Sequence, residues 1–324
     1  MSRLINHPLP AFLKLIRFEN LLMIVVTQYM LRYLVVQRVL LANGLTPGLE
    51  NGLFTLVVLS TVMIAAGGYI INDYFDVKTD LLNHPDTVVL DKVIKRRWAI
   101  TLHFVLTNGG LFIGMYAALQ TGYLRLALFH FIAAILLWFY STHFKKSLLI
   151  GNLVVSLLTA AVAFMPLVYE FGVLEKMQTG YITHHPDVFL HALKMTTLFA
   201  VFAFITSMAR EIIKDMEDVY GDSQTGGHTL PISWGMQAGR LVAFFLLLIT
   251  ALLILFVVYN TVRAEHQFLT IHNLYLLILL VLPLVVLGLY LLRAKESKDF
   301  KRASLTLKLI MLAGLSYALV YYYY

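Results

Sequence analysis

Aspartates are concentrated in two short windows of the sequence. Of the 18 acidic residues, five lie between positions 73 and 91 and five between positions 211 and 222. In each window three aspartates are separated by three and then four residues; they are Asp73, Asp76 and Asp80, and Asp215, Asp218 and Asp222. Because a helix turns by about 100° per residue, this spacing predicts three carboxylates on one helix face in each window.

Three carboxylates on one face repel each other unless cations lie between them. Divalent cations take oxygen ligands, and Mg²⁺ is usually held by a few carboxylates together with the phosphates of a substrate. The windows therefore predict a Mg²⁺ site and a phosphorylated substrate. The alternative is a solvated helix end balanced by nearby lysines and arginines. The repetition of the spacing, in a chain poor in acids, favours the metal site.

Basic side chains suited to binding phosphate lie before, between and within the two windows. They are Arg17, Lys95, Arg96, Arg97, Lys145, Lys146, Arg210 and Lys214. Arg210 and Lys214 alternate with the carboxylates of the second window, which favours a role at the site. Read alone, each basic residue is also explained as an anchor at the membrane surface.

The elements that position these residues must be membrane helices. The chain has 324 residues, of which 60% are hydrophobic and 13% charged, against roughly 45–50% and about 25% in soluble domains. This composition excludes a water-soluble fold. The absence of cysteine excludes disulfides, thiolate metal sites and a cysteine nucleophile. The net charge of +7 is better explained by membrane topology than by binding of nucleic acid.

Nine stretches are long and apolar enough to form helices that cross a bilayer core of about 30 Å. The predicted fold class is therefore all-α, a polytopic membrane protein with nine transmembrane helices. Basic residues within the first, sixth and ninth stretches, such as Arg32, are expected to extend toward the lipid headgroups. The stretches cover residues 20–40, 51–72, 99–124, 126–144, 147–169, 188–209, 241–262, 267–292 and 303–324.

Charge asymmetry between the loops predicts the orientation. With the N-terminus retained and placed in the cytoplasm, both acidic windows and most of the 25 basic residues fall on the cytoplasmic side, as the positive-inside rule requires. The windows follow the second and sixth helices. We therefore predict one membrane domain over residues 1–324, integral to the cytoplasmic membrane, in which helices 1–4 and 5–8 form a pseudo-repeat and helix 9 is appended.

The two windows resemble the motifs of UbiA-type membrane prenyltransferases. Residues 72–80 fit the pattern NxxxDxxxD, and residues 218–222 fit DxxxD. The resemblance extends to residues 17–20, 140–145 and 151–152, and the nine predicted helices agree with a UbiA-type bundle. Residues 210–222, with Thr229-Leu-Pro231 after them, are most similar to the branch of geranylgeranylglycerol-phosphate geranylgeranyltransferases, which make ether lipids.

This resemblance implies a Mg²⁺-dependent transfer of a prenyl group from an allylic diphosphate to a lipophilic acceptor. It implies metal binding by Asn72, Asp73, Asp76, Asp80, Asp215, Asp218 and Asp222, with Asp76, Asp80, Asp218 and Asp222 essential for catalysis. The implied substrate-binding residues are Arg17, Asn20, Lys95, Arg97, Tyr140, Lys145, Arg210 and Lys214. Tyr140, like Tyr74 or Phe144, would stabilise an allylic cation. The implied partners are the prenyl diphosphate, the acceptor and the bilayer, with no nucleic acid and no obligate protein partner.

One departure from the family pattern concerns the acceptor. Many members that use aromatic acceptors carry an Arg-Pro pair after the first motif, which residues 83–90 lack. We therefore expect a glycerol-phosphate ether as acceptor, with Lys95, Arg96 or Arg97 contacting its phosphate. Prenylation of an aromatic ring, as in quinone biosynthesis, is the alternative. Two other functional classes are a cation-coupled transporter and an inactive scaffold of the same fold. Transport sites lie near the middle of the bilayer, so the position of the acids at helix ends argues against a transporter.

Overall fold

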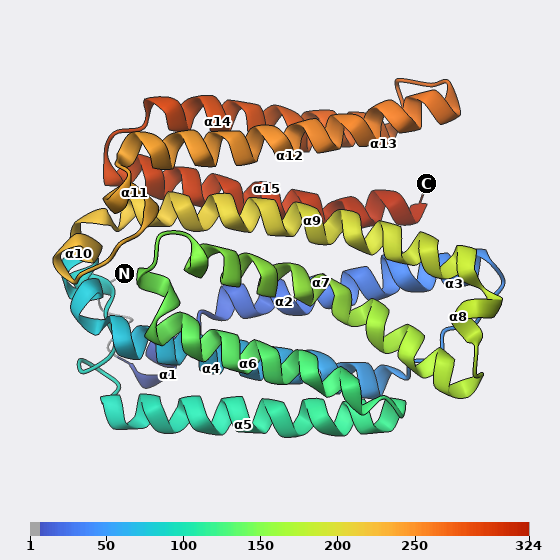
Figure 1. Cartoon of the computed structure of the whole chain (residues 1–324), viewed down its shortest axis with the longest axis horizontal. Coiled ribbons are helices and arrows are strands. Elements are labelled where there is room, and N and C mark those ends of the chain that lie inside the picture. The colour runs from blue at the N-terminus through green and yellow to red at the C-terminus, as the bar shows by residue number, and fades with distance from the viewer. Residues whose placement is uncertain (1–6, 324) are drawn as a thin grey trace. The chain divides into compact units, whose positions relative to one another are not determined.

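The computed structural model describes residues 7–323, and within them nine helical stretches are long and apolar enough to cross a membrane. The predicted all-α polytopic fold with nine transmembrane helices is thereby confirmed. The chain forms two compact units, residues 1–145 with 162–194, and residues 146–161 with 195–324. Figure 1 shows the order of the helices along the chain.

The first unit contains the helices that carry the first acidic window. Long helices α4, α5 and α6 pack against one another, with α2 against α4. The unit comprises α1 (Pro8–Leu15), α2 (Phe18–Met30), the π-helix η1 (Leu31–Val36), α3 (Gln37–Ala42), α4 (Asn51–Asn83), η2 (Pro85–Thr87), α5 (Arg96–Thr121), η3 (Leu124–Leu126), α6 (Ala127–Thr142), α8 (Tyr181–His184), and parts of α7 (Ile150–Met177) and α9 (Pro186–Glu217).

The second unit contains the second acidic window and most of the C-terminal helices. Its core is an apolar cluster in which α12 packs against α14 and α14 against α15. The unit comprises the remaining parts of α7 and α9, followed by α10 (Val219–Gln224), α11 (Leu230–Ser233), α12 (Met236–Glu265), α13 (Ile271–Tyr275), the π-helix η5 (Leu276–Val281), α14 (Leu282–Arg293) and α15 (Ser297–Tyr323).

Close packing between α4 and its neighbours depends on small residues. A Cβ atom on Gly67 would lie 2.3 Å from the hydroxyl of Thr107 in α5, and one on Gly68 would lie 2.8 Å from Leu137 in α6. Without a hydrophobic force between helices in lipid, such close backbone approach is a main source of helix association. The glycine pair therefore serves helix packing.

Arg32 corrects the expectation that basic residues in the spans extend toward headgroups. Its side chain is fully buried, with 0% of its surface exposed. The guanidinium donates to the carbonyl of Leu49 at 2.5 Å and lies 4.5 Å from the centroid of the Phe54 ring. Glu170 accepts the backbone N–H of Leu49 at 3.0 Å. Burial of the Arg32 guanidinium is favoured because two groups within the protein interact with it. The loop before α4 provides a hydrogen-bond acceptor, and the Phe54 ring provides a π face.

Candidate active site

The first acidic window lies at the C-terminal end of the second membrane helix, α4. Helix α4 continues beyond its apolar stretch to Asn83, so Asp73, Asp76 and Asp80 share one helix at the spacing of a single face. Asp76 is 5% exposed and Asn72, one turn earlier, is 6% exposed. The oxygen atoms of these residues therefore lie at the end of α4, beyond its apolar turns.

Arg17 neutralises the first of these carboxylates. It connects α1 to α2 with φ 50° and ψ 55°, a left-handed conformation that costs a non-glycine residue energy. From there it donates to Asp73 Oδ1 at 2.9 Å, and its guanidinium lies 5.0 Å from the Tyr69 ring centroid. Burial alone would lower the pKa of Arg17, but Asp73 and Tyr69 outweigh burial and raise it. The strained backbone therefore places a permanent positive charge against the motif.

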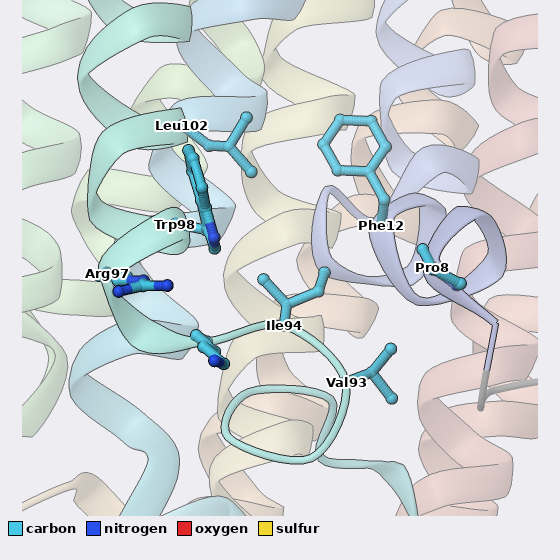
Figure 2. A pocket seen from close by; sticks show the side chains of 8 residues that line it. Pro8, Phe12, Val93, Ile94, Arg97, Trp98 and Leu102 are labelled. Carbon is cyan, nitrogen blue, oxygen red and sulfur yellow. The ribbon is translucent and has the colours of Figure 1, made fainter.

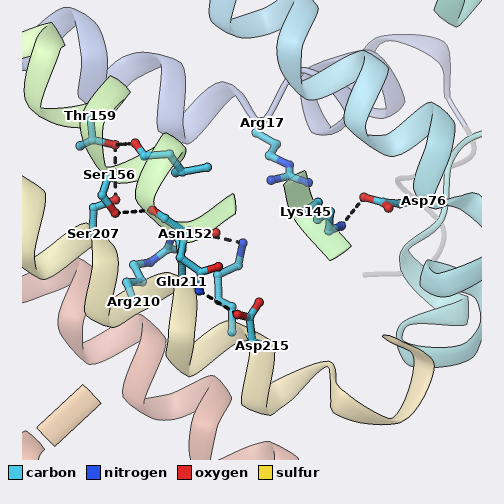
Figure 3. Close-up of polar contacts among 12 residues, drawn as sticks. Arg17, Asp76, Lys145, Asn152, Ser156, Thr159, Ser207, Arg210, Glu211 and Asp215 are labelled. Carbon is cyan, nitrogen blue, oxygen red and sulfur yellow. Dashed lines mark hydrogen bonds and ion pairs between the residues drawn. The ribbon is translucent and has the colours of Figure 1, made fainter. Parts of the chain in front are cut away.

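Lys145 neutralises the buried carboxylate in the same way. It lies just after α6 and donates a charge-assisted hydrogen bond to Asp76 Oδ2 (Figure 3). Burial would lower the pKa of Lys145, but Asp76 and Tyr140 outweigh burial and raise it, so the amine is charged. Asp80 also interacts electrostatically with Lys145. Lys145, Tyr140 and the first motif thus form one electrostatic cluster.

Asn72 provides the observation that tests whether this cluster suits a divalent cation. Its Oδ1 atom is buried and has no hydrogen-bond partner among the described residues. Buried polar oxygens are rarely left without a partner, because desolvation costs about 1–3 kcal/mol. An amide oxygen beside carboxylates is a donor set that Mg²⁺ prefers. The residues present therefore fit a Mg²⁺ ion.

The second acidic window lies in the second unit, where Asn152 holds Asp215. The Asn152 amide donates to Asp215 Oδ2 at 2.7 Å (Figure 3). Glu211 pairs with both basic residues of this window, with 3.5 Å to Arg210 Nη1 and 3.9 Å to Lys214 Nζ. This arrangement keeps two positive charges at the window.

The second trio of aspartates corrects the expectation of one continuous helix face. Helix α9 ends at Glu217, and Asp218 has φ −97° and ψ 5°, outside the α-helical region. Asp222 then lies on the short helix α10. Helix α10 leads into a loop in which Gly226 has φ 77°. The equal spacing in sequence therefore does not give equal geometry in the two windows.

The loop after the second window is held by hydrogen bonds to Lys146, which lies in the same unit. Lys146 donates from Nζ to the carbonyl of Thr225 at 2.8 Å, and His228 donates its backbone N–H to the Lys146 carbonyl at 2.8 Å. The N–H of Gly227 bonds to the Asp222 carbonyl at 2.8 Å. These bonds, all within the second unit, fix where the second window ends.

Several predicted site residues are not paired with the acids of the windows within residues 7–323. Lys95 and Arg97 line a groove beside α1 and form no ion pair within residues 7–323. The side chain of Asn20 has no hydrogen-bond partner in the same range, although its backbone N–H bonds to the Arg17 carbonyl at 2.8 Å. Across the described part of the chain, no three His, Asp or Glu side chains converge as a metal cluster. Basic and amide side chains, such as Lys145 and Asn152, pair with the carboxylates instead.

Asn152 and Glu211 were not predicted as site residues from the sequence. Asn152 lies in a stretch that resembles the prenyltransferases. That resemblance could have predicted Asn152 as a site residue, and the structure shows it bonded to Asp215. The strain at Arg17 also had no sequence signal, because left-handed backbone is usual for glycine and not for arginine.

Comparison with known proteins relates the chain to prenyltransferases. The profile of the UbiA prenyltransferase family matches residues 30–315. A digeranylgeranylglyceryl phosphate synthase of Methanothermobacter thermautotrophicus is 32% identical over 198 residues, which are 60% of this chain and 62% of the relative. The chain thus spans less than two thirds of that relative. A synthase of the same name from Methanobrevibacter smithii is 30% identical over 79% of this chain and 82% of the relative.

Solved structures share the fold. That of a digeranylgeranylglyceryl phosphate synthase has a TM-score of 0.64 at 22% identity and covers 97% of this chain and 98% of that chain. The structure of a UbiA homolog from Archaeoglobus fulgidus, bound to DMAPP and Mg²⁺, has a TM-score of 0.52 at 16% identity. The match covers 95% of this chain and 99% of the homolog.

Proposed function

Because the chain belongs to the UbiA prenyltransferase family, we propose that it transfers a prenyl group from an allylic diphosphate to the hydroxyl of a glycerol-phosphate ether, with Mg²⁺ as cofactor. The reaction takes place at the membrane surface, where the donor and acceptor have their headgroups. The relatives named digeranylgeranylglyceryl phosphate synthase support this acceptor, as does the missing Arg-Pro pair in residues 83–90.

The observation that carries the proposal is the alternation of carboxylates and cations at the end of α4. Asp73 is paired with Arg17 and Asp76 with Lys145, beside the unpartnered oxygen of Asn72. A diphosphate leaving group needs both kinds of residue. Oxygen ligands hold its metal, and cationic donors bind its phosphate oxygens directly.

The reaction breaks the bond between C1 of the prenyl chain and the diphosphate oxygen, and the electron pair leaves with pyrophosphate. The acceptor hydroxyl oxygen forms the new bond to C1, and its proton passes to solvent. Mg²⁺, when bound, would supply positive charge that neutralises the departing pyrophosphate. We assign Mg²⁺ binding to Asn72, Asp73, Asp76 and Asp80 in the first window, and to Asp215, Asp218 and Asp222 in the second window.

The cationic residues of the windows bind the diphosphate in this proposal. Lys145 and Arg17 exchange their carboxylate partners for phosphate oxygens, which their charged state at neutral pH allows. Arg210 and Lys214 do the same in the second window. Tyr140 interacts electrostatically with Arg17 and Lys145, which places an aromatic ring near the charge of the reacting groups.

A panel of acceptors tests the proposed substrate class. We expect the purified protein, with geranylgeranyl diphosphate and Mg²⁺, to prenylate geranylgeranylglycerol phosphate and to leave hydroxybenzoate and dihydroxynaphthoate unchanged. Each product is identified by mass spectrometry from parallel reactions. Turnover of an aromatic acid without turnover of the glycerol phosphate would reject the acceptor and retain the prenyltransferase.

Labelling of single cysteines tests the orientation that the basic residues favour. The chain has no native cysteine, so we expect Cys at Asp86 or Gln224 to resist an impermeant thiol reagent in intact cells and to react after permeabilisation. Both positions are exposed. Cys at Gln178, also exposed and on the opposite side in this topology, is the control that reacts in intact cells. The reverse pattern would contradict a cytoplasmic site.

A further inference from the structure

A groove of about 360 Å³ lies on the first unit between α1 and the start of α5. Phe12 of α1 faces Leu102 and Trp98 of α5, and Ile94 closes the groove from the loop before α5 (Figure 2). Its volume is at the lower end of small-molecule sites, which measure roughly 300–1,000 Å³. The groove therefore has room for a headgroup and the first part of one hydrocarbon chain.

The charge of the groove is entirely positive. Its charged lining residues are Lys95 and Arg97, both exposed, and no acid lines it. A phosphomonoester carries about −1.5 to −2 charges at neutral pH, which matches these two cations, whereas a phosphodiester carries one. Without carboxylates the groove provides no ligand for Mg²⁺, which favours a phosphomonoester over a metal-bound diphosphate as its occupant.

Both walls of the groove lead directly to the first acidic window. Helix α1 is followed by Arg17, which bonds to Asp73. Arg96, between the two cations of the groove, donates to the carbonyl of Tyr74 at 2.9 Å, and its guanidinium lies 4.8 Å from the Tyr74 ring centroid. A lipid held in the groove is thus bound by the same elements that position the carboxylates of α4.

We propose that this groove captures the phosphorylated acceptor lipid, with its phosphomonoester on Lys95 and Arg97 and the start of its chain against Phe12, Trp98 and Leu102. This assignment rests on the proposed function, because it takes the acceptor to be a lipid phosphomonoester. It adds a binding site outside the acidic windows. Lys95 and Arg97 would bind the phosphate of the acceptor in this site, and would not serve only as anchors in the headgroup region.

Trp98 provides a probe of the groove that is independent of catalysis. It is 56% exposed, and replacing Trp138 and Trp234 by Phe leaves it as the single tryptophan. In nanodiscs of phosphatidylcholine, we expect brominated phosphatidic acid, a monoester, to quench Trp98 more strongly than brominated phosphatidylglycerol, a diester. Changing Lys95 and Arg97 to Gln should abolish the difference, whereas K301Q/R302Q, which removes two exposed charges elsewhere, should preserve it.

Kinetics then connect the groove to the acceptor. With geranylgeranylglycerol phosphate, we expect K95Q/R97Q to raise KM by about tenfold or more, as loss of charge-assisted hydrogen bonds would do, and to lower kcat much less. The KM for geranylgeranyl diphosphate should stay within about twofold, a change that corresponds to well under 1.4 kcal/mol.

Two results would overturn the inference. Equal quenching by the monoester and the diester would indicate general attraction of anionic lipids, and an unchanged KM for the acceptor would remove the capture role. If the wild-type protein turned over none of the acceptors, the proposed function would be rejected instead. The quenching of Trp98 would still decide whether the groove selects phosphomonoesters.

Discussion

Turnover falls by at least about a thousandfold when either Asp76 or Asp218 is replaced by Asn; this is the largest effect we expect from single substitutions. Each change removes one negative charge from a window without a large change in volume. Mg²⁺ held by carboxylates stabilises the charge on a leaving group by several kcal/mol, and each 1.36 kcal/mol corresponds to a tenfold change in rate. Initial rates of ether formation, at equal amounts of protein in detergent, measure the effect.

Matched variants separate chemistry from folding. D76N leaves Lys145 without its carboxylate, which is expected to destabilise the protein because removing one member of a buried ion pair leaves an uncompensated charge. D76N/K145Q should therefore recover the thermal midpoint that D76N loses without recovering turnover. Recovery of both quantities in the double variant would show that Asp76 serves only to hold Lys145.

Acids outside the repeated trios are the controls for charge. Asp86 is exposed in the first window, and Glu296 is exposed and paired with Lys298 in the second unit. D86N and E296Q should each retain turnover within about threefold, since surface ion pairs contribute little, typically under about 1 kcal/mol. Near-wild-type turnover in D76N or D218N would contradict a reaction that depends on both windows.

Removal of divalent metal is expected to have an equally large effect. EDTA should silence prenyl transfer by the wild-type protein, and Mg²⁺ should restore it. Ca²⁺ should restore much less, because Mg²⁺ favours a compact octahedral set of oxygen ligands and Ca²⁺ a larger and looser one. Retention of the rate in EDTA would reject the assignment of the oxygen-bearing residues to a metal, whatever the variants show.

The membrane helices could be predicted from the sequence because each is a long apolar run with at most two charged residues. All nine were predicted, and family membership, inferred from two short motifs, is confirmed by the match over residues 30–315. The helix ends were less accurate. The apolar stretch that predicted α9 ends at residue 209, whereas the helix ends at Glu217, because a helix continues as long as its backbone bonds form, whether or not its side chains are apolar.

The contacts of the site could not be predicted in the same way. Arg17 meets Asp73 across 56 residues and Lys145 meets Asp76 across 69 residues, so only the packing of helices brings them together. The turn at Asp218 was also missed, because the sequence spacing of the second trio equals that of the first. Arg32 was expected to reach the headgroups, but its guanidinium donates to the Leu49 carbonyl. Leu49 lies in a loop, and hydrophobic periodicity does not predict where a loop lies.

Counting pyrophosphate and ether product in the same reaction tests the central claim most directly. With wild-type protein, geranylgeranyl diphosphate, geranylgeranylglycerol phosphate and Mg²⁺, we predict one pyrophosphate released for each ether formed, and neither product in EDTA. Omitting the acceptor should suppress both. Pyrophosphate release without ether would indicate hydrolysis, and absence of both products with every substrate present would contradict Mg²⁺-dependent prenyl transfer to a glycerol-phosphate ether.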